Sequence, residues 1–452
     1  MKTRLPYWIG LSVAAVGASV WLGRAHAPRA AQNSAPVTGQ SAMVRRRYDP
    51  DFVQENLEFA AKQVRADPQS AISRATLANW YLEKYRETGD NADVLAADKA
   101  ARASLKLRTH NNGEASFQLS RSLVAQHRFP EALAAARRAA LYNRVALRQC
   151  ADIQIETGDY KAAQRDLLRS PFEKKDPAYL ALQARLLEIG GNPHGALELL
   201  QRAATEADAN PEVTPQVVAW FYERLGHIQS QMGQLDAAEK SYKRGLSLFP
   251  RDYRTMAALL RLDTARGDWR AAIKWGNKAA AIVPAPDTIA LLGDAHLALG
   301  EKKEAAQKYR LVETMGQLAR SQGVIYDRQR AIFYADQKRN LKEALNLARG
   351  ELKFRHDIYA YDALAWIYFQ MGQLEPAQAA SDKALQWKTG DAMLWYHAGL
   401  IADGRGQKER ARFNLKRALA LNPYFLTPAA PRRARAILAR LDKSGVSNSR
   451  TP

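Results

Sequence analysis

The chain has 452 residues, of which 47% are hydrophobic and 25% are charged, and its mean hydropathy is −0.42. This composition is typical of a water-soluble folded protein, which excludes a multi-pass membrane protein and a wholly disordered chain. The formal net charge is +21, and the single cysteine, Cys150, excludes an intrachain disulfide bond and a cysteine-based zinc site.

The first segment, residues 1–27, is predicted to be a signal peptide or an N-terminal membrane anchor. Lys2 and Arg4 precede residues 5–23, which carry no charged side chain. An uncharged stretch of this length suits either a signal peptide or a membrane-spanning helix, and a buried core helix is the alternative. The basic residues before it favour a body outside the cytoplasm, which places the protein in the cell envelope or periplasm.

The sequence leaves open whether this segment is cleaved. Residues 25–27 have the small-x-small form of a cleavage site, but Pro28 follows them directly and disfavours cleavage. Residues 28–50 show no hydrophobic periodicity and are predicted to form a flexible tether.

The positive charge is concentrated at the two ends of the chain. Residues 1–50 carry a net charge of +6 and residues 404–452 carry +10. Both ends are interpreted either as ordinary solvated surface or as segments attracted to anionic lipid or an anionic envelope polymer.

From about residue 51 the chain repeats itself with a period of 34 residues. Gly233 and Gly267 are 34 residues apart, and so are Gly372 and Gly406. A repeat of this length is typical of a helical array rather than of a set of separate globular domains.

The unit resembles the tetratricopeptide repeat. The segment 219–252 carries the small, aromatic, glycine and proline residues of that family's pattern at Tyr222, Leu225, Gly226, Gly233, Ala238, Tyr242, Gly245 and Pro250. The segment 358–391 carries Tyr361, Leu364, Ala365, Tyr368, Gly372, Ala377 and Ala384, with Thr389 in place of the proline. The segment 392–425 carries Trp395, Gly399, Gly406, Ala411, Ala418 and Pro423.

This spacing has a physical reason. Small residues let two antiparallel helices approach closely, glycine ends the first helix, and proline ends the second. Each helix pair leaves an apolar face that the next pair covers. The predicted fold is therefore all-α: a right-handed superhelical solenoid of antiparallel helix pairs, with about ten 34-residue repeats and a C-terminal capping helix.

The repeats are predicted to fall into an N-terminal array over residues 51–210 and a C-terminal array over 211–425, followed by a basic capping helix and tail over 426–452. The proline-containing stretch 204–216 exceeds the period by about eight residues. It is interpreted either as the boundary between the two arrays or as a long surface loop. A shorter excess lies at residues 317–324.

No catalytic, cofactor or metal motif stands out. The eight histidines are scattered, and phosphate-binding, dinucleotide-binding and nucleophile-elbow motifs are absent from the sequence. Cys150 falls at a helix-packing position and is expected to be a buried thiol. We therefore expect no enzyme activity, no cofactor, no metal and no small-molecule substrate.

The resemblance implies that the first helix of each repeat lines a concave groove that contacts ligands. Carried onto this sequence, the implied partner-binding residues are Arg121, Arg148, Arg185, His227, Arg254, Arg261, Tyr326, Tyr359, Trp366 and Tyr396. Guanidinium groups and rigid aromatic rings suit a carboxylate-bearing peptide with an apolar segment. The alternatives are core packing for the aromatic residues and a solvated face for the arginines.

The predicted function is that of a non-catalytic scaffold or adaptor that binds protein partners or peptides in its groove at the cell envelope. Membrane contact is expected through the N-terminal segment. The alternative is a binder of an anionic polymer, either an acidic exopolysaccharide or a nucleic acid, through the basic ends.

Overall fold

The computed structural model describes residues 48–171, 175–321 and 328–447, and within these ranges the chain contains α-helices and no strand. The predicted anchor, cleavage site and most of the tether lie outside the described residues. In the first half the helices are α1 (Phe52–Ala66), α2 (Ala71–Thr88), α3 (Asn91–Leu107), α4 (Gly113–Ala125), α5 (Phe129–Ala140), a short 3-10 turn (Arg144–Ala146), α6 (Leu147–Thr157), α7 (Tyr160–Arg169), α8 (Pro177–Ile189), α9 (Pro193–Ala209), α10 (Pro215–Gln231) and α11 (Leu235–Leu248). In the second half they are α12 (Tyr253–Arg266), α13 (Trp269–Ile282), α14 (Pro286–Ala298), α15 (Lys302–Ser321), α16 (Arg328–Asp336), α17 (Leu341–Glu351), α18 (Ile358–Gln370), α19 (Leu374–Leu385), α20 (Ala392–Gly404), α21 (Lys408–Leu421) and α22 (Ala429–Ser447).

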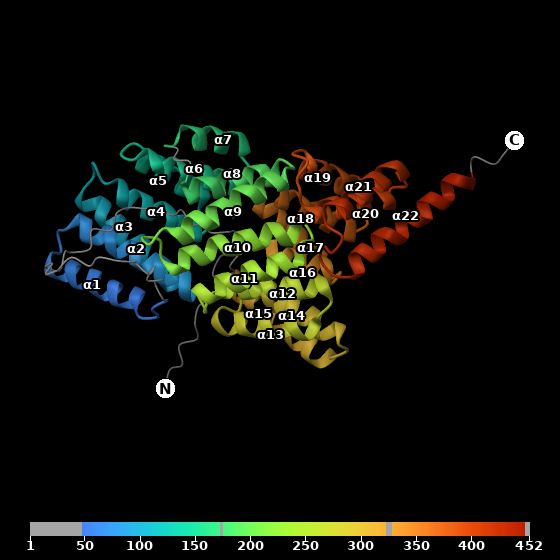
Figure 1. Cartoon of the computed structure of the whole chain (residues 1–452), viewed down its shortest axis with the longest axis horizontal. Coiled ribbons are helices and arrows are strands. Elements are labelled where there is room, and N and C mark those ends of the chain that lie inside the picture. The colour runs from blue at the N-terminus through green and yellow to red at the C-terminus, as the bar shows by residue number, and fades with distance from the viewer. Residues whose placement is uncertain (1–47, 172–174, 322–327, 448–452) are drawn as a thin grey trace, which may run out of the picture.

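Consecutive helices pack as ten hairpins, from α2 with α3 to α20 with α21, and the hairpins stack in chain order (Figure 1). The first helices of most neighbouring hairpins also contact each other, as α2 does with α4 and α18 with α20. The first helices therefore form a shared surface along most of the array, which we call the inner face. The predicted all-α repeat array of about ten units is confirmed.

Local sequence signals set the ends of the helices. Asp252 and Asp268 are N-caps whose carboxylates accept hydrogen bonds from the backbone N–H groups of Arg254 and Ala271. Such a cap contributes about 1 kcal/mol. Gly267 ends α12 with a φ of +81°, a conformation that glycine adopts without steric cost.

Small residues allow the two helices of a hairpin to touch, as the spacing predicts. A Cβ atom on Gly226 would lie 2.5 Å from the Tyr242 ring of the partner helix, and one on Gly399 would lie 2.5 Å from Leu415. Ala238 is fully buried in the same hairpin as Gly226. Because the helix axes are close, each hairpin forms a compact unit and presents an apolar edge to the next one.

The extra residues at 204–216 mostly lengthen a helix. Helix α9 continues to Ala209, and α10 begins at Pro215 after a short connection. The two helices pack directly, and the Tyr222 hydroxyl on α10 donates to Asp208 on α9 at 2.9 Å. The second stretch that exceeds the period lies at residues 317–324, and α15 extends into it as far as Ser321. Residues 322–327 lie outside the described residues.

The superhelix is closed, because later repeats return to lie against earlier ones (Figure 1). The N–H of His356 donates to the carbonyl of Thr157 at 2.9 Å, and the N–H of Gly390 donates to the carbonyl of Glu188 at 3.1 Å. The Asn422 side chain donates to the carbonyl of Ser230 at 3.0 Å. In each contact a turn inside an early hairpin meets the connection that follows a late hairpin.

Helix α22 covers the last hairpin, as the predicted capping helix does. Its Ala430 and Ala434 are buried in the same apolar cluster as Leu415 and Phe425, and its Leu441 packs on the last hairpin near Ala411. Beyond this contact α22 projects away from the body (Figure 1). Among the described helices, none combines the length and the apolar character needed to cross a membrane.

Candidate functional site

Several of the predicted partner-binding residues connect neighbouring repeats across the inner face. Arg121 on α4 donates to Asn79 at 3.0 Å and to Glu83 at 2.8 Å, both on α2. Arg185 on α8 donates to Asp152 at 2.5 Å and to Glu156 at 2.6 Å, both on α6. These arginines therefore hold consecutive repeats in register, and contact with a partner stays a prediction for them.

The other predicted arginines also have partners within the chain. Arg148 is 8% exposed and donates to Asp176 at 2.6 Å, while Arg261 is paired with Asp287. Arg254 lies over the ring of Tyr253 and donates to the carbonyl of Arg86 at 2.9 Å, which leaves its second terminal nitrogen without a partner in the described part of the chain.

The predicted aromatic residues are mostly packed inside the fold. Trp366 is buried, stacks on His397 with ring centroids 4.2 Å apart, and donates from its indole N–H to Asp336 at 2.7 Å. Tyr396 is buried and its ring lies 5.0 Å from that of Phe425. Tyr359 is half-buried at the start of α18. Tyr326 lies outside the described residues.

His227 and Glu223 differ from these residues because neither makes a hydrogen bond or an ion pair with another described residue. They are one helical turn apart on α10 and so lie on the same face of it. Burial, followed by the nearby Arg224, lowers the pKa of His227 well below its usual value. Burial also raises the pKa of Glu223, although Arg224 opposes this rise.

A buried ionic cluster, which the sequence analysis missed, joins two turns of the superhelix. Arg355, which follows α17, donates to the carbonyl and the carboxylate of Glu156 on α6, both at 3.0 Å. Arg328 contacts Glu351 at 2.7 Å and Asp357 at 2.6 Å, and these two acids also face Arg355. We call Glu156, Arg328, Glu351, Arg355 and Asp357 the inter-turn ionic cluster.

The arginines of this cluster keep its acids charged. Burial alone would raise the pKa of Asp357, but Arg328 and then Arg355 hold it below the usual value for an aspartate. The same carboxylate caps α18 by accepting from the N–H groups of Tyr359 and Ala360. No periodic signal points to this cluster, because Glu156 and Arg355 are separated by 199 residues.

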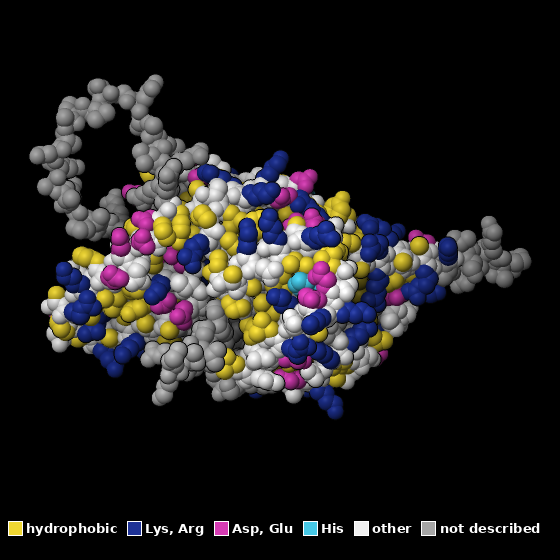
Figure 2. All heavy atoms as spheres, turned by 90° about the horizontal axis from the view of Figure 1, so that it is seen from below, with side chains coloured by type: hydrophobic (Ala, Val, Ile, Leu, Met, Phe, Trp, Pro, Cys, Tyr) yellow, Lys and Arg dark blue, Asp and Glu magenta, His cyan; other side chains and the backbone are white. Residues whose placement is uncertain are grey.

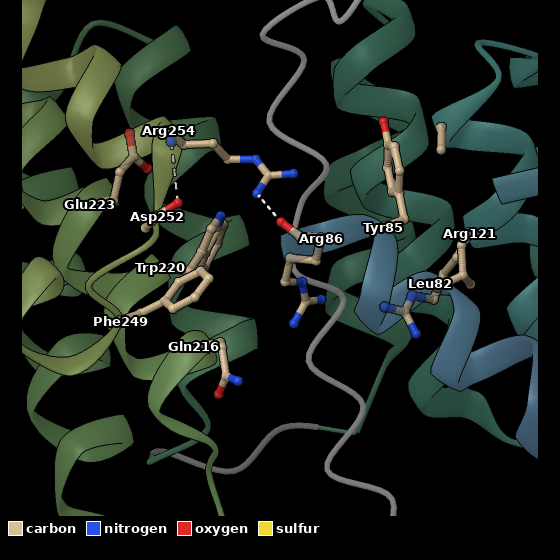
Figure 3. A pocket seen from close by; sticks show the side chains of 11 residues that line it. Leu82, Tyr85, Arg86, Arg121, Gln216, Trp220, Glu223, Phe249, Asp252 and Arg254 are labelled. Atoms are coloured by element: carbon tan, nitrogen blue, oxygen red, sulfur yellow. Dashed lines mark hydrogen bonds between the residues drawn. The ribbon is translucent and has the colours of Figure 1, made fainter. Parts of the chain in front are cut away.

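A pocket opens where the inner face of the first repeats meets that of the middle repeats (Figure 3). Helices α2 and α4 form one wall, and α10, α12 and the connection before α12 form the other. The lining residues are Leu82, Tyr85, Arg86, Arg121, Ala125, Gln216, Trp220, Glu223, Phe249, Asp252 and Arg254. Two predicted residues, Arg121 and Arg254, thus lie in one pocket, although they come from repeats far apart in the chain.

The described residues satisfy only part of the hydrogen-bonding capacity of the polar groups in the pocket. Arg86 has one ion pair, to Glu83 at 3.0 Å, and Arg254 points at the backbone carbonyl of Arg86 (Figure 3). Trp220, Phe249 and Leu82 supply apolar surface between these cations. The pocket therefore offers guanidinium donors beside an aromatic wall, which is the chemistry of a site for a carboxylate attached to an apolar group.

Other kinds of site find less support in the described residues. No group of three or more His, Cys, Asp or Glu side chains within them is placed to hold a metal ion. Cys150 is buried, and burial followed by the charge of Asp166 raises the pKa of its thiol to about 12. Such a thiol stays protonated at neutral pH and is a poor nucleophile.

A model of the tetratricopeptide repeat matches three segments of this chain, residues 221–252, 358–391 and 393–425. These segments coincide with the hairpins α10–α11, α18–α19 and α20–α21. No curated protein matches the chain.

Three solved structures illustrate the similarity of the chain to known folds. A tetratricopeptide repeat protein from Parabacteroides merdae ATCC 43184 is 21% identical over 59% of this chain and 98% of its own, with a TM-score of 0.34. A chain of the APC/C hetero-tetramer Cut9-Hcn1 is 13% identical over 86% of this chain and 94% of its own, with a TM-score of 0.33. A human IFIT1 dimer with PPP-AAAA is 16% identical over 74% of this chain and 77% of its own, with a TM-score of 0.47.

These TM-scores lie below 0.5, so the assignment depends on the three matched segments and on the stacked hairpins of the chain itself. Stacked hairpins of this family generally serve as non-catalytic scaffolds for protein interactions. Residues 221–252, 358–391 and 393–425 are thus tetratricopeptide repeats, and they support the identification of the chain as a tetratricopeptide repeat protein.

Proposed function

We propose that the protein is a non-catalytic scaffold of the cell envelope that binds a carboxylate-bearing peptide segment of a partner protein in the pocket between α2, α4, α10 and α12. The observation that carries the proposal is the presence of Arg86 and Arg254 beside Trp220 and Phe249 in one opening of the inner face.

The two arginines supply the recognition of the carboxylate. Arg86 uses one terminal nitrogen for Glu83, and Arg254 uses one for a backbone carbonyl. The remaining donors of both side chains can bind carboxylate oxygens without breaking a bond that holds the fold. A hydrogen bond between charged groups contributes about 1.5–3 kcal/mol, which corresponds to roughly tenfold or more in affinity.

The aromatic wall supplies the second part of the recognition. Trp220 is half-buried, so it keeps accessible surface inside the pocket. An apolar side chain next to the bound carboxylate would cover Trp220 and Phe249, and it would gain about 25 cal/mol for each Å² of apolar surface removed from water. Glu223, on the same wall, disfavours a peptide with an acidic residue beside it and so contributes specificity.

The location in the envelope is supported by the sequence of the N-terminus. The uncharged stretch at residues 5–23 follows Lys2 and Arg4, which is the arrangement of an exported or anchored protein with its body outside the cytoplasm. The proposed location is checked separately by adding a protease to cells with a permeabilised outer layer. A body outside the cytoplasm should be digested.

The binding site is tested by crosslinked capture of the full-length protein from its native host, followed by mass spectrometry. The variant Arg86→Gln removes one of the cations proposed to bind the carboxylate. The variant Trp220→Ala removes part of the aromatic wall. Arg270→Gln is the matched control, because Arg270 is exposed on α13, outside the pocket. Circular dichroism of every variant checks that the helices are intact.

We expect the same small set of envelope proteins with the wild type and with Arg270→Gln, and its loss with both pocket variants. Synthetic peptides from the captured proteins then bind with a free carboxylate and lose roughly tenfold in affinity as C-terminal or side-chain amides. Capture that is unchanged in both pocket variants would show that the partner binds elsewhere.

A further inference from the structure

The C-terminal end of the molecule carries a concentrated positive charge. Residues 408–443 contain ten Lys and Arg residues and two acidic residues, and they form α21, its following connection and most of α22. Figure 2 shows Lys and Arg side chains gathered over this end of the molecule, with hydrophobic side chains among them. The proposal that follows is independent of the peptide pocket.

An exposed phenylalanine stands within the basic face of α21. Phe413 is 63% exposed, and Arg410, Lys416 and Arg417 lie three or four residues from it. Side chains at this spacing share one face of a helix. The opposite face of α21 is the buried one, with Ala411, Leu415 and Ala418 in the core.

The packing of α22 places further basic residues beside that face. Arg412, at the start of α21, donates to the carbonyl of Leu441 at 3.1 Å, so the far end of α22 lies next to the start of α21. The two helices are therefore antiparallel, and the first turns of α22, with Arg432 and Arg435, lie at the end of α21 that carries Arg417.

The connection between the two helices adds exposed apolar side chains at the same end. Tyr424 is 49% exposed and Leu426 is 41% exposed. We call Phe413, Lys416, Arg417, Tyr424, Leu426, Arg432 and Arg435 the basic apolar surface.

The described residues leave three cations of this surface without an ion pair. Arg410, Arg412 and Arg440 each form ion pairs with nearby acids. In contrast, Arg417, Arg432 and Arg435 are exposed and make no ion pair with any described residue.

We propose that the basic apolar surface docks onto the headgroup region of an anionic lipid bilayer. Cations attract the anionic headgroups, and exposed apolar side chains enter the boundary between headgroups and acyl chains. A nucleic acid would use the same cations and could stack on the aromatic rings, but it offers no apolar environment for Leu426. The presence of an aliphatic side chain among the cations therefore favours a membrane.

Binding of the full-length protein to vesicles tests the charge part of this proposal. Vesicles of equal parts phosphatidylglycerol and phosphatidylcholine are compared with vesicles of phosphatidylcholine alone. The triple variant Arg417→Glu, Arg432→Glu, Arg435→Glu is compared with the control Lys240→Glu, Arg270→Glu, Lys274→Glu, which makes the same change in net charge at exposed positions on α11 and α13.

We expect the first triple variant to lose about a hundredfold in partitioning to the anionic vesicles, since each cation contributes about fivefold. The control should lose much less. Equal losses in the two triple variants would overturn the proposal, because they would show a response to net charge alone.

A reporter on the surface itself excludes attachment through another part of the chain. Phe413→Cys, in a Cys150→Ala background, carries an environment-sensitive dye, and Leu95→Cys on α3 is the matched exposed control. We expect a blue shift of the dye at position 413 with anionic vesicles and none at position 95. A shift with single-stranded DNA but not with vesicles would replace the membrane with a nucleic acid, and no shift with either would end the proposal.

Discussion

Asp152 on α6 illustrates how burial and ion pairing compete at a single residue. Its carboxylate is 3% exposed and accepts a hydrogen bond from Arg185 at 2.5 Å. Burial raises its pKa to about 6, although Arg185 opposes the rise, and the neighbouring Glu156 adds to it. The inner face therefore contains a carboxylate whose charged form is unfavourable in the folded chain.

This pKa predicts a specific dependence of stability on pH. The folded value of about 6 lies above that of an unfolded aspartate, about 3.9, so the folded chain binds the proton more tightly. The contribution of Asp152 to the free energy of unfolding is therefore highest at low pH and is lost as the pH rises through about 6. Asp152→Asn should stabilise the protein at pH 8 by on the order of 3 kcal/mol and at pH 5, which lies between the two pKa values, by about half as much.

Urea unfolding of the wild type and the variant at both pH values measures this difference. Asp236→Asn is the control, because that side chain is 94% exposed. A stabilisation by Asp152→Asn of the same size at both pH values would contradict the titration argument.

At the scale of the element, the turns inside the hairpins differ in what they face. Gly158 ends α6 with a φ of +86°, and a Cβ atom there would lie 2.4 Å from the backbone of His356. Gly372 follows α18 with a φ of +73°, but a Cβ atom there would meet nothing within 4 Å. The residue at this repeat position therefore allows the chain to turn between the two helices of a hairpin. Where two turns of the superhelix meet, a glycine there also allows the two backbones to approach closely.

Alanine substitution separates these two purposes. Gly372→Ala should cost about 1–2 kcal/mol, because a residue with a Cβ atom is strained at positive φ. Gly158→Ala has the same strain and must also displace the backbone of His356, so we expect an additional loss of about 1–3 kcal/mol. Urea unfolding measures the free energy of unfolding of both variants. Equal losses would show that the close approach of Gly158 and His356 does not affect stability.

At the scale of the whole molecule, the inter-turn ionic cluster connects repeats that the chain order keeps apart. Glu156 belongs to the third hairpin, and Arg355 lies between the eighth and the ninth. The side chains of Glu156, Glu351 and Asp357 are at most 4% exposed. The neighbouring arginines therefore stabilise the charged form of each buried carboxylate. The compact form of the superhelix therefore depends on a few long-range contacts as well as on the stacking of neighbours.

Arg355→Met tests this dependence. The variant leaves Glu156 buried without one of its two arginines, and loss of one partner of a buried pair typically costs about 3–5 kcal/mol. Because each repeat still contacts its neighbours, we expect the helices to persist while the turns separate. Small-angle X-ray scattering should show a larger radius of gyration with an unchanged circular dichroism spectrum.

Arg128→Met is the matched control for that experiment. Arg128 is paired with Glu131 at the surface, where an ion pair contributes about 0–1 kcal/mol. An unchanged radius of gyration in Arg355→Met would mean that the remaining contacts between turns close the superhelix without the cluster.

The 34-residue pattern is sufficient to predict the hairpins of this protein and their order. One hairpin illustrates this: Gly267 forms its turn, Asp268 caps its second helix, and Ala272 allows its helices to pack closely. All three residues act on neighbours in the chain. The capping helix was also predictable, because the apolar edge of the last hairpin must be covered by a neighbour.

The contacts between distant repeats are visible only in the folded molecule. Arg86 and Arg254 share a pocket although they come from different turns of the superhelix, and Glu156 meets Arg355 across 199 residues. The rotation from one repeat to the next is small and accumulates over the array, so the contacts between turns depend on the sum of many packing angles. The 34-residue pattern describes a hairpin and its neighbours, and it contains no information about that sum.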